Sequence, residues 1–281
     1  MTTASSHNSA SFASESAISE NTLTPPTAWD DLKRSLCRHR LWRYLSWREL
    51  ARQYDRTRIG VLWIALNVLL HVMILGFIFS QLFPGERYLP HFAVGFAVWT
   101  AMGRAAGEAS ALWTTAEKYL RHLSVPLYLF VIKLVVKSGI VLAFTLPTGL
   151  AVALVTGARP GWSLPLVLPG IAVVLMNIAW MAVLYSLACL RFRDLAKFTP
   201  NLIFLCYLGT PIMWPPEQLG DHQWIAQFNP LYHLIELVRA PLTVGPPEPI
   251  SWVVSLTLGI TGCTIAFFVF AAFRRRIVLW L

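Results

Sequence analysis

The stretch IGVLWIALNVLLHVMILGFIFSQLF, residues 59–83, contains no Asp, Glu, Lys or Arg. A helix that crosses the hydrocarbon core of a bilayer needs about 20 apolar residues, whereas a strand of a membrane β-barrel needs about 10. The stretch is long enough for a transmembrane helix, and it therefore predicts a fold built from such helices.

The composition of the whole chain agrees with this prediction. Of the 281 residues, 56% are apolar and 13% are charged, and soluble domains carry roughly 25% charged residues. Four further uncharged runs occur at 138–158, 160–190, 198–216 and 249–273. We therefore predict an all-α integral membrane protein.

Six transmembrane helices are expected within a membrane domain that covers residues 59–273. Their expected bounds are 59–83, 90–113, 126–156, 162–190, 198–214 and 250–273. The second span carries Arg104 and Glu108 four positions apart on one helix face, where the two charges can neutralise each other. Gly103 and Gly107 in the same span have the GxxxG spacing that permits close helix packing.

The segments outside the spans differ sharply in composition. Residues 1–27 are rich in Ser, Thr and Ala without Lys or Arg, which predicts a disordered tail and not a signal peptide. Residues 28–58 mix bases with leucines and aromatics, which predicts an amphipathic helix in the cytoplasmic membrane interface. A soluble helix packed on another domain is the alternative. Residues 274–281 are expected to form a basic cytoplasmic tail.

The distribution of Lys and Arg predicts the orientation in the membrane. With the N-terminus inside, the inner segments hold nine bases in 1–58 and three each in 104–125, 191–197 and 274–281. The outer segments hold only Arg87, Arg159 and Arg239. The positive-inside rule therefore places both termini in the cytoplasm. Because the bases are distributed in this way, the net charge of +9 does not indicate nucleic-acid binding.

The segment between the fifth and sixth spans is apolar but interrupted by prolines. Prolines at 211, 215 and 216 stop the fifth helix, because proline lacks the N–H and clashes with the preceding turn. An apolar, broken segment in this position predicts an external re-entrant hairpin over the outer end of the bundle.

The sequence lacks the motifs of a catalytic or metal site. It contains no P-loop, no GxSxG, no HExxH and no CxxC, and its four cysteines are expected to be packing residues. Intramembrane acids, which ion-coupled transporters use, are almost absent. We therefore predict no enzyme activity and no cofactor in this chain, so that any energy must come from a partner.

Several stretches together resemble one family. They are RELARQYDRTRIGVLWIALNVLLHVMILGFIFSQLF (48–83), EKYLRHLSVP (117–126), RFRD (191–194), TPIMWPPEQL (210–219) and FNPLYHLIELVRAPL (228–242). In order and spacing, they resemble the membrane permease subunit of ABC-type polysaccharide exporters, a group of type 2 ABC exporters for O-antigen, capsule and teichoic acid. The resemblance covers about 30–275 and is closer to the O-antigen and teichoic-acid branch.

The resemblance implies a half-transporter that pairs with a second copy as a C2 homodimer in the cytoplasmic (inner) membrane. Two separate ABC ATPase subunits would bind ATP and Mg. The substrate would be a glycan on a polyprenyl-pyrophosphate lipid, exported to the outer leaflet. A permease for a small molecule or drug and a non-transporting membrane assembly factor are the alternatives.

Two groups of site residues are expected on the cytoplasmic side. The loop that couples to the ATPase is expected to be a short helix that contains Glu117, Lys118, Tyr119, Arg121 and His122. Snorkelling to the headgroups is the simplest role for two lysines of the third span, whereas a site for the lipid pyrophosphate is the alternative role. The candidates for that site are Arg52, Arg56, Arg58, Lys133 and Lys137.

Two further groups are expected along the export path. Aromatic rings can stack on sugar faces, and the tryptophans in span positions, Trp63, Trp99, Trp113 and Trp180, are the candidates for the channel. The hairpin would close the outer end as two short helices at about 215–226 and 230–241. Its candidate gate residues are Trp214, Pro215, Asn229, Pro230, Tyr232, Leu234, Ile235 and Arg239. Within 230–241, the i, i+3, i+4, i+7 spacing predicts an apolar face, with Tyr232, Glu236 and Arg239 turned towards the outer solvent.

Overall fold

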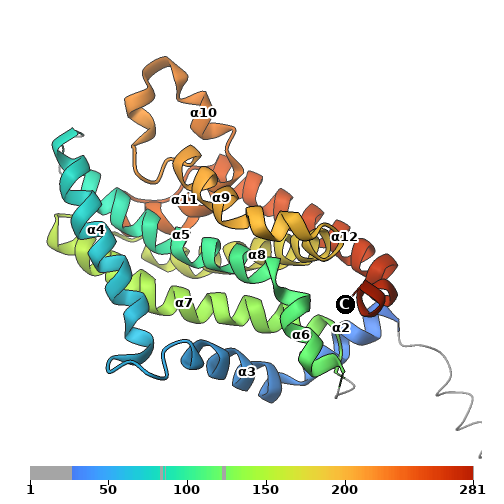
Figure 1. Ribbon diagram of the computed structural model, residues 1–281. Coiled ribbons are helices and arrows are strands. Elements are labelled where there is room, and N and C mark those ends of the chain that lie inside the picture. The colour runs from blue at the N-terminus through green and yellow to red at the C-terminus, as the bar shows by residue number, and fades with distance from the viewer. Residues whose placement is uncertain (1–26, 83–84, 86, 122–124, 281) are drawn as a thin grey trace, which may run out of the picture.

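The computed structural model describes residues 27–82, 85, 87–121 and 125–280 (Figure 1). These residues form helices and connecting turns and contain no strand, which confirms the predicted all-α class for the described part of the chain. The expected tail, except Thr27, lies outside the described residues.

The region predicted as one amphipathic helix forms two helices, α2 (Ala28–Cys37) and α3 (His39–Arg52). Thr27 begins α2 with a capping box, in which its side chain and that of Asp30 exchange hydrogen bonds with each other's backbone. The backbone leaves the helical region at Arg38, which separates the two helices. Helix α3 packs on α7 (Tyr128–Val155), where Ser46 Oγ donates to the Lys133 carbonyl at 2.9 Å.

Four helices are long and apolar enough to cross a membrane. They are α4 (Trp63–Leu82, preceded by the 3₁₀ turn η1, Gly60–Leu62), α7 (Tyr128–Val155), α8 (Val167–Arg191, preceded by η2, Leu164–Leu166) and α12 (Pro249–Trp280). Two expected spans correspond to α5 (Tyr88–Ser110) and α9 (Arg193–Gly209). Helix α5 carries two charges near its end, and α9 has 17 residues, three of them charged.

Three helices differ in their bounds from the spans expected from the sequence. The second span was expected to reach 113, but α5 stops at Ser110, and α6 (Leu112–Leu120) starts after a break at Ala111. The fifth was expected at 198–214, but α9 begins at Arg193 and gives way to extended backbone at Thr210. Helix α12 continues to Trp280, so that the basic segment 274–280 is the last part of a span helix.

Helix α5 lies at the centre of the bundle and buries most of its length. Its closest neighbour is α7, where a Cβ added to Gly149 would lie 2.7 Å from the Ala93 carbonyl oxygen. A Cβ on Gly103 would instead meet a side-chain methyl group of Ile203 at 3.3 Å. The close backbone contact is therefore made by Gly149 and not by the GxxxG pair of α5.

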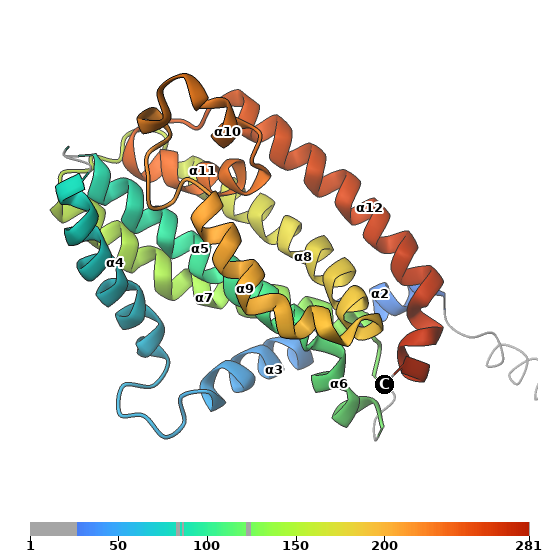
Figure 2. The ribbon, with the colours of Figure 1, turned by 45° about the horizontal axis from the view of Figure 1, so that its top comes forward.

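The hairpin comprises the 3₁₀ segment η3 (Pro216–His222), the short α10 (Trp224–Gln227) and α11 (Pro230–Thr243). Figures 1 and 2 show α10 projecting from the bundle at the end opposite to α3 and α6. Helix α11 packs on α5, α8 and α12. The positive φ of 53° at Gly220 gives the chain its turn within η3.

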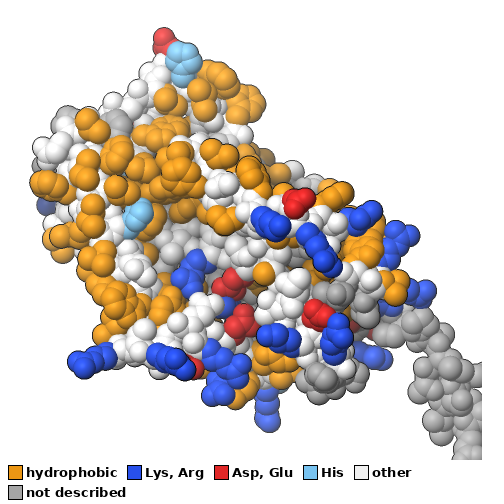
Figure 3. Space-filling view, viewed as in Figure 1, with side chains coloured by type: hydrophobic (Ala, Val, Ile, Leu, Met, Phe, Trp, Pro, Cys, Tyr) orange, Lys and Arg blue, Asp and Glu red, His pale blue; other side chains and the backbone are white. Residues whose placement is uncertain are grey.

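The charged side chains are not spread evenly over the surface. In Figure 3, Lys and Arg gather at the end that carries α2, α3 and α6, whereas hydrophobic side chains cover much of the rest of this face. The two ends of the bundle therefore differ in charge as well as in shape.

Candidate functional site

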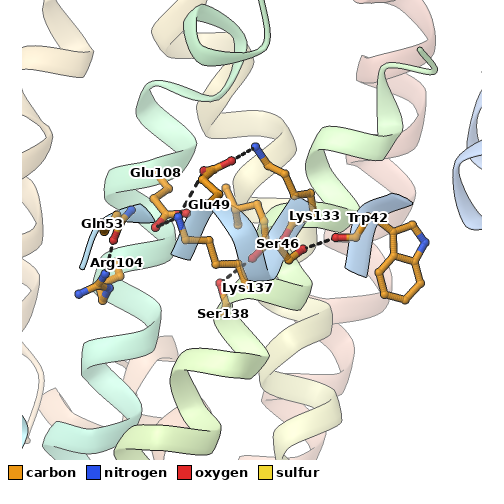
Figure 4. Close-up of polar contacts among 10 residues, drawn as sticks. Trp42, Ser46, Glu49, Gln53, Arg104, Glu108, Lys133, Lys137 and Ser138 are labelled. Carbon is orange, nitrogen blue, oxygen red and sulfur yellow. Dashed lines mark hydrogen bonds and ion pairs between the residues drawn. The ribbon is translucent and has the colours of Figure 1, made fainter. Parts of the chain in front are cut away.

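A polar cluster joins the interface helix α3 to two helices of the bundle (Figure 4). It consists of Glu49 from α3, Glu108 from α5, and Lys133 and Lys137 from α7. Lys133 Nζ lies 2.5 Å from Glu49 Oε2, and Lys137 Nζ lies 3.3 Å from Glu49 Oε1 and 2.9 Å from Glu108 Oε1. The cluster therefore balances two buried cations with two carboxylates.

The two lysines decide the ionisation of Glu49. Burial raises the pKa of Glu49, but the charges of Lys133 and Lys137 outweigh this effect, and the pKa falls below its usual 4.5. Glu49 is therefore ionised at neutral pH and holds α3 against α7. A buried charge without its partner is costly, so the members of such a cluster depend on one another.

Arg104 does not neutralise Glu108, although the two are four residues apart on α5. Its guanidinium donates to Gln53 Oε1 at 2.9 Å and to the Tyr54 hydroxyl at 3.2 Å. Residues that follow α3 therefore bind Arg104, whereas Glu108 pairs with Lys137 of α7. The expected pairing is wrong, because these residues from other parts of the chain contact both side chains.

The candidates for an anionic headgroup fall into two sets. The side chains of Lys133 and Lys137 are 5% and 1% exposed, so they do not snorkel to a lipid surface, and both are already paired. Arg52, Arg56 and Arg58 are exposed, and no ion pair joins them to an acid of the described residues. The two sets therefore differ in burial and in pairing.

The expected coupling segment contains a helix, α6, but earlier than predicted. Leu112, Trp113 and Ala116 bury one face of α6 against the bundle, and Tyr119 approaches Phe130. Lys118 and Arg121 are exposed on its other side. Glu117 pairs with Arg121 one turn on, whereas His122 lies outside the described residues.

Two of the four tryptophans expected in the channel line a common cavity. Trp99 of α5 and Trp180 of α8 line an apolar cavity of about 440 Å³ between α5, α8 and α9. Trp180 Nε1 donates to Asn177 Oδ1 at 2.9 Å, which fixes the indole. Trp113 is fully buried beside Phe270, so it is a core residue and not a channel residue. Trp63 is half-buried at the start of α4.

Arg239 of the hairpin is buried, contrary to the expectation that it faces the outer solvent. Its side chain is 2% exposed and pairs with Glu236 at 2.5 Å. It also donates to the Pro211 carbonyl at 2.9 Å and lies 2.9 Å from His91 Nε2. Because an arginine can only donate, that ring nitrogen of His91 accepts. The guanidinium thus joins α11 to α5 and to the end of α9.

Asn229 holds the start of α11 against the end of α9. Asn229 caps α11 by accepting from the Leu231 N–H, and its amide donates to the Gly209 carbonyl and to Thr210 Oγ1. Pro230 follows at the first helical position, where it costs no hydrogen bond. The turn between α9 and α11 is therefore tied to the bundle at Asn229.

Helix α11 buries its apolar face, as its spacing predicted. Leu234, Ile235 and Val238 have no exposed surface. Tyr232 is half-buried, and the Arg239 guanidinium lies 5.6 Å from its ring centre. Trp214 and Pro215 are half-buried where the hairpin begins, and the Trp214 indole donates to the Leu208 carbonyl at 3.1 Å.

The chain belongs to the ABC-2 type transporter family, whose sequence model matches residues 40–243. It is similar to the O-antigen export system permease protein RfbA of Klebsiella pneumoniae, with 25% identity over 67% of this chain and 74% of that protein. It is also similar to the protein of the same name from Myxococcus xanthus, with 26% identity over 69% of this chain and 76% of that protein. The family resemblance inferred from the sequence is confirmed.

The sequence reasoning missed Glu49 and His91. Ser46, Glu49 and Gln53 recur at helical spacing, and all three contact other helices. A polar stripe at this spacing on an otherwise basic helix was the available signal for Glu49. No such signal pointed to His91, because its partners lie far away in the sequence.

Proposed function

We propose that the chain is the permease half of an ABC exporter that moves a polyprenyl-pyrophosphate-linked, O-antigen-like glycan across the cytoplasmic membrane. The observation that carries this proposal is the similarity to O-antigen export permeases over two thirds or more of both chains. The membership of the ABC-2 type family supports the same class of transport.

The proposed architecture has six spans, with α5 and α9 added to the four long apolar helices. Helix α5 is sheltered by its neighbours, so its charged end does not face lipid. Both termini are placed in the cytoplasm, and two copies form a C2 homodimer. The gathering of bases at the end with α2, α3 and α6 supports this orientation (Figure 3).

The energy for transport is assigned to two copies of a separate ABC ATPase, which bind ATP and Mg. This chain is then the transport channel and not an enzyme. Helix α6 is the proposed docking element, because it buries one face and leaves Lys118 and Arg121 accessible. Reversing both charges is expected to weaken the complex with the ATPase, whereas reversing Arg87 and Arg159 at the other end is not.

The proposed substrate path uses groups at both ends of the bundle. Arg52, Arg56 and Arg58 would receive the pyrophosphate at the inner leaflet, since arginine binds phosphate oxygens in a bidentate manner. Trp99 and Trp180 would offer rings to the sugar faces. The outer hairpin would open for the polymer, and its exposed part, residues 216–227, would move while α11 stays seated through Arg239.

The function is tested by purifying the chain with its ATPase in a form that binds but does not hydrolyse ATP. Mass spectrometry of the retained lipid is expected to find a glycan on a polyprenyl pyrophosphate. Retention of a small molecule would instead support a drug exporter, and a chain that binds no ATPase would support an assembly factor.

The orientation has a separate test with reporter tags. Tags at Gly85, Arg159 and Asp221 are expected to read outside, and a tag after Leu281 is expected to read inside. A tag at Asp221 that reads inside would overturn the six-span topology.

A further inference from the structure

A second, polar cavity lies at the end of the bundle that carries the hairpin. Its volume is about 540 Å³, within the range of about 300–1,000 Å³ that small-ligand sites occupy. Three separate parts of the chain form its wall: the start of α5, the connection between α7 and η2, and the hairpin. Each part contributes one charged side chain, Arg87, Arg159 and Glu217 respectively.

The two arginines of this cavity lack acidic partners among the described residues. Neither Arg87 nor Arg159 takes part in any of the ion pairs found there, and both are exposed. Glu217 lines the same cavity without forming an ion pair with either one. The cavity thus brings together two arginines from distant positions with space between them and the acid.

The third arginine at this end behaves differently. Arg239 is buried behind the cavity wall and fully engaged by Glu236, the Pro211 carbonyl and His91. His91 also lines the cavity, but its Nε2 already accepts from Arg239. Contacts among the described residues therefore account for Arg239 and for that nitrogen of His91, whereas no acid among those residues pairs with Arg87 or Arg159.

We propose that this cavity is a binding site for an anionic group, a phosphate or a carboxylate, which Arg87 and Arg159 hold together. A guanidinium offers a planar set of donors that matches both kinds of anion. Gln218 from the hairpin also lines the cavity and adds an amide that can donate to a sugar hydroxyl or to the anion.

The role of this site in export rests on the proposed function. A lipid pyrophosphate or an acidic sugar that reaches the outer end would bind the two arginines. Because Glu217 and Gln218 belong to the hairpin, an anion in the cavity repels the first and attracts the second. Binding is therefore coupled to the position of the hairpin, whereas a neutral glycan would leave that position unchanged.

The test measures protection of a cysteine placed in the cavity wall. The four native cysteines are replaced by serine or alanine, and Gln218→Cys is labelled with a neutral maleimide in the purified full chain. Methylenediphosphonate represents the phosphate source, a glucuronic acid disaccharide represents the carboxylate source, and a neutral disaccharide is the control. A cysteine at Asp221, which does not line the cavity, reports labelling outside it.

We expect either anion to slow labelling at position 218 but not at position 221. Replacing Arg87→Gln together with Arg159→Gln should raise the half-protecting concentration about tenfold or more, since each lost charge-assisted hydrogen bond weakens binding. The matched pair Arg40→Gln with Arg43→Gln removes the same charge from exposed positions of α3 and should leave protection unchanged. Calorimetry on the chain with its own cysteines checks the same difference between the two pairs.

Several outcomes overturn the site. The first is that neither anion protects at about 10 mM, where binding would be too weak to use. The second is equal protection at 218 and 221. The third is protection that persists after both arginines are replaced. The more effective anion identifies the source. If the anions protect position 218 but the chain purified with its ATPase retains no glycan, the proposed function is refuted and the anion site remains supported. Glycan export without protection would refute this site alone.

Discussion

The two ends of this bundle each bury an ion pair, but they build it in different ways. At the end with α3, Glu49 joins lysines that lie 84 and 88 positions further along the chain. At the hairpin end, Arg239 pairs with Glu236 only three positions before it on the same helix. In the proposed orientation, Glu49, Glu108, Lys133 and Lys137 form the inner cluster, and Arg239 and Glu236 form the outer pair. The inner cluster therefore connects separate helices by its charges, whereas the outer pair is local.

The difference shows what each cluster can hold. If the inner cluster loses Lys137, both Glu49 of α3 and Glu108 of α5 lose a partner, and the contact between α3 and α7 weakens. If the outer pair is lost, Glu236 can turn towards solvent, since its side chain is already 18% exposed. What remains lost there is the guanidinium link to the Pro211 carbonyl and His91. We expect the loss of the inner cluster to destabilise the whole protein, and the loss of the outer pair to destabilise only the hairpin.

The largest effect is expected from Lys137→Met. This change leaves Glu108 without its cation and should lower the free energy of unfolding by about 3–5 kcal/mol, the usual result of breaking a buried pair. Adding Glu108→Gln should restore much of the loss, because the orphaned charge is removed. Unfolding by denaturant in detergent micelles measures both variants. Lys118→Met, on the exposed face of α6, is the control, and an equal loss there would contradict the comparison.

A smaller and more local effect is expected from Arg239→Met. The Pro211 carbonyl and Glu236 lose their donor, which should cost about 1–3 kcal/mol. Hydrogen exchange should rise over residues 211–229 and stay unchanged in α7. Exchange that rises equally in both places would show that the outer pair also holds the bundle together.

Helix α5 supplies Glu108 to the inner cluster and His91 to the contacts of Arg239. Its packing against α7 can be tested separately. Gly149→Ala places a methyl group against the Ala93 backbone and should cost about 1–3 kcal/mol through overpacking. Gly103→Ala meets only side chains, of which a methyl group of Ile203 is nearest and can shift, and it should cost less. Thermal unfolding of the two variants compares them directly, and the reverse order would mean that the GxxxG pair is the closer contact.

The smallest effect is a pH dependence of the inner cluster. Because the pKa of Glu49 is lowered from 4.5 in the folded protein, its stabilising effect is complete above that value and is lost as the pH falls through the lower folded pKa. The hydrogen-exchange protection factors of α3, which correct for the intrinsic pH dependence of amide exchange, should therefore stay constant above about pH 5 and fall below pH 4.5. Glu49→Gln should remove this change. A wild-type protein without it would show that Glu49 does not hold α3.

The parts of the fold that could be read from the sequence are those set by local composition. The run at 59–83 predicts a helix because an apolar stretch of that length has few other stable forms, and α4 occupies residues 63–82. Asn229 and Pro230 predict the start of α11, because a cap and a fixed φ act within one turn. The apolar face of α11 follows from spacing alone.

The predictions that failed concern partners from other helices. Arg104 and Glu108 are one turn apart, but they do not pair with each other. Arg104 binds Gln53 and Tyr54, and Glu108 pairs with Lys137. Arg239 lies on the polar side of its helix and is nevertheless buried, because α5 and the Pro211 carbonyl cover that side. A periodic pattern states which residues share a face, but it does not state what lies opposite.

By itself, the sequence determined the membrane class, the helical content and the family, since each depends on residue composition or on motifs read in order. The tertiary structure alone decided that Lys133 and Lys137 are neutralised by Glu49 and Glu108, and that Arg87 and Arg159 share one cavity. The physical reason is that the free energy of a charge in a protein depends on what lies within a few ångströms of it, and those neighbours come from distant parts of the chain.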